Sequence, residues 1–397
     1  MFLTVSEVKL FFHLLIVAPL LAAGSQETER AWEHFYNLEY EQALKLFESA
    51  AANEPNSPAL HNHIAQTLLF REMYRVGALE SEMVSGNDAF LRRDKLKPSK
   101  GTEDRFHLEV AKAMELAQAR LKENPNDTRA MYDLGISHGL KSNYNFLVRR
   151  AWMDALRDAT AGRKLHNKVT ELDPSNIDAR MMQGMHDYIV GSLPFFYKVL
   201  GFLAGFRGDR QEGIRTLQLV AERGGDNRVD AEIILAVLYR REKRYKEALP
   251  LLDDLIRRFP RNYLLWFERG QMYSALGDKE RAIGSIQAVA ERKRKGMGGF
   301  ERVPWEKIYY QLATVQFWYN DLEEALANFE KVAKGANEVD LNTEVLTWMR
   351  LGQIHDLTGQ REDALEAYRK AIAAAPSAAA ARESKRYLRS PYRRERA

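Results

Sequence analysis

The sequence predicts an all-α protein, a right-handed superhelical α-solenoid of about eight helical hairpins. One observation is that small residues recur with a period near thirty-four positions. Another is that a proline follows several of these units, where it would end the second helix of a hairpin. One hairpin cannot bury its apolar face alone, so the units must stack on each other. The apolar content of 45% and the charged content of 29% agree with such a folded protein.

The repeat is clearest at Ala248 and Ala282, which lie thirty-four residues apart. A small residue at this place allows the two helices of a hairpin to cross closely, and a large side chain four residues later fills the space against the next hairpin. The series of small residues, which we call the anchors, identifies eight units: Ala43, Ala113, Gly162, Gly213, Ala248, Ala282, Ala325 and Ala364.

The residues around the last anchor resemble the tetratricopeptide repeat, a helix–turn–helix unit. They are Trp348, Leu351, Gly352, Gly359, Tyr368, Ala371 and Pro376. The resemblance covers about 25–376 and implies a concave surface that binds protein or peptide, usually without catalysis. Three units are longer, with insertions near 78–105, 143–160 and 188–208. The remainder, 377–397, is expected to be a capping helix and a basic tail.

The same resemblance implies that the first helix of each hairpin lines a partner-binding groove. The groove positions are Met181, Met185, Tyr188, Ile233, Ile234, Val237, Arg240, Arg241, Phe267, Gln271, Tyr310, Phe317, Trp318, Met349 and Gln353. This lining is largely apolar and contains methionine, which suits a helix or an apolar segment of a partner. The alternative is that part of it packs against the apolar insertion of the fourth unit.

That insertion, 188–206, is apolar on most sides and has Lys198 near its centre. The lysine, Pro194 and several glycines offset its apolar side chains, which disfavours a membrane span. Two interpretations remain: the segment is core that fills the superhelix, or it is a docking surface for lipid or a partner helix. Its principal residues are Leu193, Pro194, Phe196, Leu200 and Phe206.

A narrower resemblance covers 188–217. Its residues are Ser192, Leu193, Pro194, Leu200, Gly205, Phe206, Gly208, Asp209, Arg210, Gly213 and Leu217. They resemble the signature of the tetratricopeptide repeat protein 39 family, although Phe195 stands where that signature usually has a second proline. The resemblance implies a cytosol-facing protein linked to lipid handling, which conflicts with the export predicted from the N-terminus.

Residues 1–24 are expected to be a signal peptide. Leu10 to Ala23 is an apolar run too short for a usual membrane span and typical of a secretory leader. Small residues place cleavage near Gly24 and Ser25, which makes the protein periplasmic or secreted. An uncleaved N-terminal anchor is the alternative.

Composition excludes several classes of function. The net charge is +4, and the segment from Arg382 onward has seven basic and two acidic residues, so the rest is nearly neutral and a nucleic-acid partner is not expected. There is no cysteine. His61 and His63 are two apart on a predicted helix and make no metal pair. The Gly-rich segment 292–302 lacks the order of a phosphate-binding loop and is expected to be a solvated loop.

We therefore expect no catalytic, metal or cofactor site. The first function hypothesis is an exported scaffold that binds a protein or peptide segment in its groove. The second is a membrane- or lipid-associated protein that uses 188–206 and the basic tail for peripheral contact.

Overall fold

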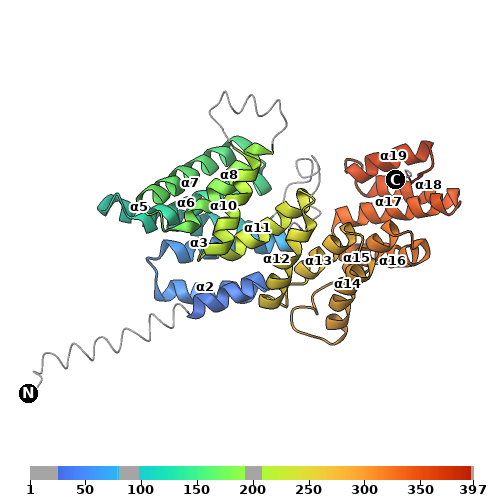
Figure 1. Ribbon diagram of the computed structural model, residues 1–397, viewed down its shortest axis with the longest axis horizontal. Coiled ribbons are helices and arrows are strands. Elements are labelled where there is room, and N and C mark those ends of the chain that lie inside the picture. The colour runs from blue at the N-terminus through green and yellow to red at the C-terminus, as the bar shows by residue number, and fades with distance from the viewer. Residues whose placement is uncertain (1–25, 78, 80–97, 193–207, 395–397) are drawn as a thin grey trace, which may run out of the picture. The chain divides into compact units, whose positions relative to one another are not determined.

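The computed structural model describes residues 26–77, 79, 98–192 and 208–394. Within these ranges every regular element is a helix, as the sequence predicts (Figure 1). The chain divides into two compact units. Unit 1 comprises Met1–Arg75 and Lys95–Glu232, and unit 2 comprises Val76–Asp94 and Ile233–Ala397.

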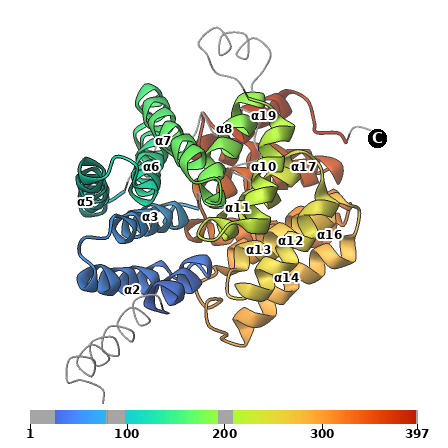
Figure 2. The same ribbon diagram turned by 60° about the vertical axis from the view of Figure 1, so that its left-hand side comes forward.

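Unit 1 contains the first four hairpins. A helix over 26–36 precedes α2 (Tyr40–Asn53), and α3 (Pro58–Arg75) pairs with α5 (Lys100–Glu123). The third hairpin is α6 (Thr128–Tyr144) with α7 (Trp152–Leu172), which lie side by side in both views (Figure 2). The fourth is α8 (Met181–Gly191), preceded by the 3-10 turn Ile177–Arg180, with α10 (Arg210–Arg223).

Unit 2 contains the last four hairpins. The fifth is α11 (Arg228–Arg241), which begins in unit 1, followed by α12 (Tyr245–Arg258). The others are α13 (Tyr263–Ala275) with α14 (Lys279–Arg294), α15 (Trp305–Trp318) with α16 (Leu322–Lys334), and α17 (Leu341–Leu357) with α18 (Arg361–Ala374). Helix α19 (Ala379–Arg389) packs against α18 and α17 at the position where a capping helix is expected.

All eight anchors are buried, each in the second helix of its hairpin. Gly213 shows why one unit has glycine where others have alanine. An added Cβ there would lie 2.5 Å from the backbone nitrogen of Tyr188 and 2.6 Å from the carbonyl oxygen of Gly184. The two backbones of the fourth hairpin therefore approach too closely for any side chain at this anchor.

The three longer units carry their extra length in different ways. In the third hairpin most of 143–160 is helical, and a five-residue π-helical turn, Asn145–Arg149, with Arg150 at φ 57°, joins α6 to α7. In the second, α5 already begins at Lys100, so 100–105 is helical. In the fourth, α8 runs to Gly191, while Leu193, Pro194, Phe196, Leu200 and Phe206 lie outside the described residues.

Most of the segment 292–302 is an exposed connection, as the sequence predicts, because 295–302 is not helical and 295–298, 301 and 302 are exposed. Two features differ: helix α14 continues to Arg294, and Phe300 is only 1% exposed. The guanidinium carbon of Arg292 lies 4.0 Å from the centre of the Trp266 ring. The buried side chain of Phe300 thus holds this connection against the body of unit 2. The guanidinium of Arg292 covers the indole of Trp266.

Candidate protein-binding surface

The first helices of successive hairpins contact each other within each unit, α3 with α6 and, in unit 2, α13 with α15 and α15 with α17. The predicted groove positions lie on first helices, and we call the side of each unit that these helices form the first-helix side. It is built differently in the two units.

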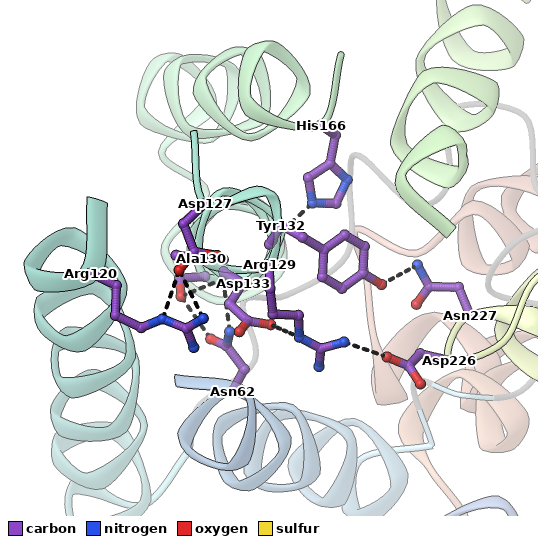
Figure 3. A network of polar contacts seen from close by, with 11 residues as sticks. Asn62, Arg120, Asp127, Arg129, Ala130, Tyr132, Asp133, His166, Asp226 and Asn227 are labelled. Atoms are coloured by element: carbon purple, nitrogen blue, oxygen red, sulfur yellow. Dashed lines mark hydrogen bonds and ion pairs between the residues drawn. The ribbon is translucent and has the colours of Figure 1, made fainter. Parts of the chain in front are cut away.

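In unit 1, this side carries a network of hydrogen bonds and ion pairs, which we call the polar network (Figure 3). The side-chain amide of Asn62 on α3 donates to the carbonyl oxygen of Asp133 on α6 at 2.8 Å, and the hydroxyl of Ser137 donates to Asn62 at 2.8 Å. Arg129 lies 3.4 Å from the carboxylate of Asp133 and 3.3 Å from that of Asp226. Polar side chains therefore connect α3, α6 and the loop that contains Asp226.

Tyr132 is the second node of the polar network. Its hydroxyl accepts a hydrogen bond from Asn227 at 2.9 Å, and its ring stacks on that of His166 with centroids 4.9 Å apart. His166 must donate from Nε2 to the carbonyl oxygen of Tyr132, 3.1 Å away, because a carbonyl can only accept. The carboxylate of Asp178 accepts from the backbone amides of residues 225–227, which holds the loop before α11 in place.

A further contact joins the two ends of unit 1. The hydroxyl of Tyr36, in the first hairpin, donates to Asp230 in the first turn of α11 at 3.2 Å, across 194 residues of sequence. The polar network and this contact lie mainly on first helices, the helices to which the repeat resemblance assigns the groove.

Burial shifts the titration of these groups. It raises the pKa of Asp133 to about 6, against the opposing effect of Arg129, and it raises the pKa of Asp230 to about 6. Burial lowers the pKa of His166 and that of His63, which packs against Trp32, to about 4. Perturbed groups in one place indicate a functional site or a structural ion-pair network. Asp133, Asp230 and His166 each have a partner inside unit 1, which favours the structural role.

Unit 2 has a shorter polar row on the same side. The guanidinium of Arg240 on α11 lies 3.0 Å from the carboxylate of Glu268 and donates to the amide oxygen of Gln271 at 2.6 Å, both on α13. Gln271 then donates to Gln311 on α15 at 3.3 Å. This row links the first helices of hairpins five to seven.

Beyond this row, at hairpins seven and eight, the surface is aromatic. Trp318, at the end of α15, is 56% exposed. The guanidinium of Arg350 on α17 lies 4.9 Å from the Trp318 ring and 4.8 Å from the ring of Phe317, and it donates to Gln353 at 2.7 Å. We call Phe317, Trp318 and Arg350 the aromatic patch.

The structure corrects the predicted lining. Tyr188, Phe267, Tyr310, Phe317, Met349 and Gln353 are buried. Met181, Met185, Ile233, Ile234, Val237, Arg240 and Gln271 are partly buried, and only Arg241 and Trp318 are exposed. The buried apolar members pack between hairpins: Tyr310 and Phe317, for example, join the core of Phe329 and Ile354. The six buried positions therefore do not line an open groove, and for the remaining positions the largely apolar lining stays a prediction.

Three residues that form this side were missed by the sequence analysis. Glu268, Gln311 and Arg350 each follow a predicted position directly, namely Phe267, Tyr310 and Met349. The signal was present in the repeat, since all three occupy the same place relative to their anchors, and a shift of one residue in register would have found them.

The described ranges hold no cluster of three or more His, Asp or Glu residues suited to a metal ion. His61 instead contacts Glu109, with Nδ1 and Oε2 2.7 Å apart. None of the helices in the described part of the chain combines the length and apolar content that crossing a bilayer requires.

Comparison with known proteins identifies the repeats. Tetratricopeptide repeat models match residues 235–296 and 345–378, which cover hairpins five, six and eight. These hairpins are tetratricopeptide repeats, and the resemblance predicted from the sequence is confirmed. The narrower resemblance over 188–217 stays a prediction. A stack of such repeats suggests a protein-binding scaffold.

Several solved structures are similar to this chain. Yeast Tom70 is 14% identical over 93% of this chain and 98% of its own, with a TM-score of 0.39. Human IFIT1, solved as a dimer with m7Gppp-AAAA, is 14% identical over 92% of this chain and 87% of its own, with a TM-score of 0.44. Pseudomonas aeruginosa PilF is 12% identical over 66% of this chain and 99% of its own, with a TM-score of 0.39. These scores carry no functional inference. No curated protein sequence matches the chain.

Proposed function

We propose that this tetratricopeptide repeat protein is a non-catalytic scaffold that binds a segment of another protein on the aromatic patch of hairpins seven and eight. The observation that carries the proposal is Trp318, which is 56% exposed while Arg350 lies against its ring. Tryptophan and arginine are the residue types that most often dominate the free energy of binding at protein interfaces. An indole already held in place by a guanidinium loses little conformational entropy when a partner covers it.

The contrast with unit 1 supports this location. The hydrogen-bonding groups of the polar network are engaged with one another, so a partner would have to replace existing hydrogen bonds there. At the aromatic patch, burial of the exposed ring of Trp318 would add an apolar contact.

We also propose that the protein acts outside the cytoplasm. The support is the sequence of residues 1–24, with the apolar run from Leu10 to Ala23 followed by small residues. Mass spectrometry of the exported protein is expected to give a mature chain that begins near Ser25. Recovery of an exported chain that still contains Met1 would contradict cleavage.

Peripheral membrane contact through the insertion and the basic tail is not favoured. Tyr392 and Arg394 of the tail contact hairpins seven and eight instead. Only Pro391 and Arg393 among the last four described residues are exposed.

Site-specific photo-crosslinking tests the proposed surface. A photoreactive amino acid replaces Thr314, which lies one helical turn before Trp318 on α15. The matched control replaces Ala327, an exposed residue on α16 of the same hairpin. In the cell of origin we expect a discrete crosslinked protein from position 314, none from 327, and loss of the product when Trp318→Ala is added. Equal products from both positions, or a product that survives Trp318→Ala, would contradict the proposed surface.

A further inference from the structure

The segment after α19 returns to the body of unit 2. Residues Ser390–Arg394, which we call the return segment, are not helical. Their side chains alternate: Tyr392 and Arg394 are partly buried, whereas Pro391 and Arg393 are exposed. Alternation with a period of two is the property of an extended chain lying on a surface.

The backbone of the return segment is held by a buried carboxylate. The amide of Tyr392 donates to Oδ2 of Asp356 at 2.7 Å, and the side chain of Asp356, on α17, is fully buried. The same carboxylate accepts from the hydroxyl of Tyr368 at 2.8 Å and pairs with Arg361 at 2.7 Å. Asp356 therefore offers a fixed acceptor for one backbone amide, independent of the side chain that this amide carries.

The two inward side chains bind next to the aromatic patch. The ring of Tyr392 lies 5.3 Å from that of Tyr387 and 6.4 Å from that of Phe317. The guanidinium of Arg394 lies 4.9 Å from the Phe317 ring and donates to the carbonyl oxygen of Phe317, in the last turn of α15. A cation at the carboxyl end of a helix is electrostatically favourable. Phe317 is thus contacted by two guanidinium groups, those of Arg350 and Arg394.

We propose that the return segment is an intramolecular ligand, and that the surface it covers binds in trans an extended segment of a partner protein with an aromatic residue two positions before an arginine. This inference rests on the proposed function and deepens it, because it names the chemistry of the partner. The backbone amide of the aromatic residue binds Asp356, its ring binds beside Phe317, and the arginine binds the end of α15. The residue between them points to solvent, and its identity does not affect binding.

Competition from the return segment limits access to this surface. A tethered segment acts at an effective concentration of about 1 mM, so it outcompetes a partner segment of equal intrinsic affinity that is present below that concentration. Removal of the return segment is expected to strengthen binding of an added peptide by about tenfold or more.

The experiment uses the full chain and a variant that ends at Ser390. The probe is a fluorescent, C-terminally amidated peptide with the sequence of residues 388–394, and binding is measured by fluorescence anisotropy. We expect the shortened variant to bind at least about tenfold more tightly than the full chain. A peptide with Tyr392→Ala and Arg394→Ala should not bind, and a control peptide with Arg393→Ala should bind like the parent.

A second variant covers the case in which shortening affects folding. The full chain with Tyr392→Ala and Arg394→Ala keeps its length and is expected to melt cooperatively and to bind the parent peptide. Loss of the cooperative melting transition in both variants would show that the return segment is an integral part of the fold and would overturn the inference. Equal affinity of the full and shortened chains, or no binding to a folded shortened chain, would also overturn it.

These failures differ from failure of the proposed function. If the peptide does not bind the folded shortened chain but position 314 still gives a discrete crosslinked partner, the surface stands and the partner chemistry is wrong. If the peptide binds but position 314 gives no partner in cells, the return segment is a ligand and the scaffold proposal is wrong.

Discussion

The first helices of the hairpins are used in opposite ways in the two units. In unit 1 they carry the polar network, in which Asp133 is 3% exposed and paired with Arg129. In unit 2 the first helices of hairpins seven and eight carry the aromatic patch, where Trp318 is 56% exposed. The repeat architecture therefore does not by itself decide which units bind a partner. That depends on whether the groups on these helices are already satisfied inside the fold.

The physical reason is the cost of burial. A buried charge is tolerated only with a partner and hydrogen bonds, so the carboxylates of unit 1 commit its side chains to internal contacts. An exposed aromatic ring has no such requirement, and its burial by another protein is favourable. The first surface should therefore dominate stability and the second should dominate binding.

The largest expected effect concerns the fourth hairpin. Gly213→Ala places a Cβ against the backbone of Tyr188 and Gly184, which cannot move without separating the two helices. We expect a loss of about 4 kcal/mol in the free energy of unfolding, measured by urea denaturation. The control is Gly284→Ala in α14, where nothing lies within 4 Å, and a gain of about 0.5–1 kcal/mol is expected. Similar effects of both changes would remove the evidence for close packing in unit 1.

The second prediction tests the polar network. Arg129→Ala leaves the buried carboxylate of Asp133 without its ion pair and should cost about 3 kcal/mol at pH 8. The cost should be smaller at pH 5, because the pKa of Asp133, already raised by burial, lets the carboxyl accept a proton. The counterpart in unit 2 is Arg350→Ala, which removes a guanidinium that contacts rings and an amide. If Arg350→Ala costs as much as Arg129→Ala, the two units do not differ as described.

The third prediction follows from His166. Its folded pKa is about 4 against an ordinary value of 6.5, so the neutral ring gives stability that is present above pH 6.5 and is lost as the pH falls toward 4. Between pH 7 and pH 5 this loss is about 2 kcal/mol. Asp133 and Asp230 have the opposite effect on stability as the pH falls, because their raised pKa values favour proton uptake by the folded state. The test must therefore compare the pH dependence of a His166 variant with that of the parent protein.

That comparison uses His166→Gln. Its loss of unfolding free energy between pH 7 and pH 5, measured by urea denaturation, should be smaller than that of the parent by about 2 kcal/mol. The same pH dependence in both proteins would mean that His166 is not buried in its neutral form.

The smallest effect on stability is expected at the aromatic patch. Trp318→Ala should change the free energy of unfolding by about 1 kcal/mol or less, because the ring is mostly exposed, and should abolish the crosslinked product from position 314. A large loss of stability together with an unchanged crosslink would reverse the roles assigned to the two units.

The helical-hairpin fold and the buried anchors follow from the sequence because they depend on local rules. A small residue at a helix crossing and a proline after the second helix can be recognised one unit at a time. Which residues of the first helices are exposed, and which are engaged inside the fold, could not be predicted in the same way. Whether Met349 or Arg350 faces outward depends on a one-residue register, and whether Asp230 is engaged depends on a partner far along the chain. Tyr36, which binds Asp230, is 194 residues away, and no local pattern indicates this contact.

Amide hydrogen exchange of the full chain tests the central claim most directly. If the polar network holds unit 1 together, the amides of α6 around Tyr132 and Asp133 should exchange only through global unfolding and show the highest protection. The last turns of α15 and α17, at Trp318 and Asp356, should exchange through smaller local openings, and the variant that ends at Ser390 should increase exchange there and leave α6 unchanged. The account would be contradicted if α6 exchanged as fast as those last turns, or if removal of the return segment raised exchange equally in both units.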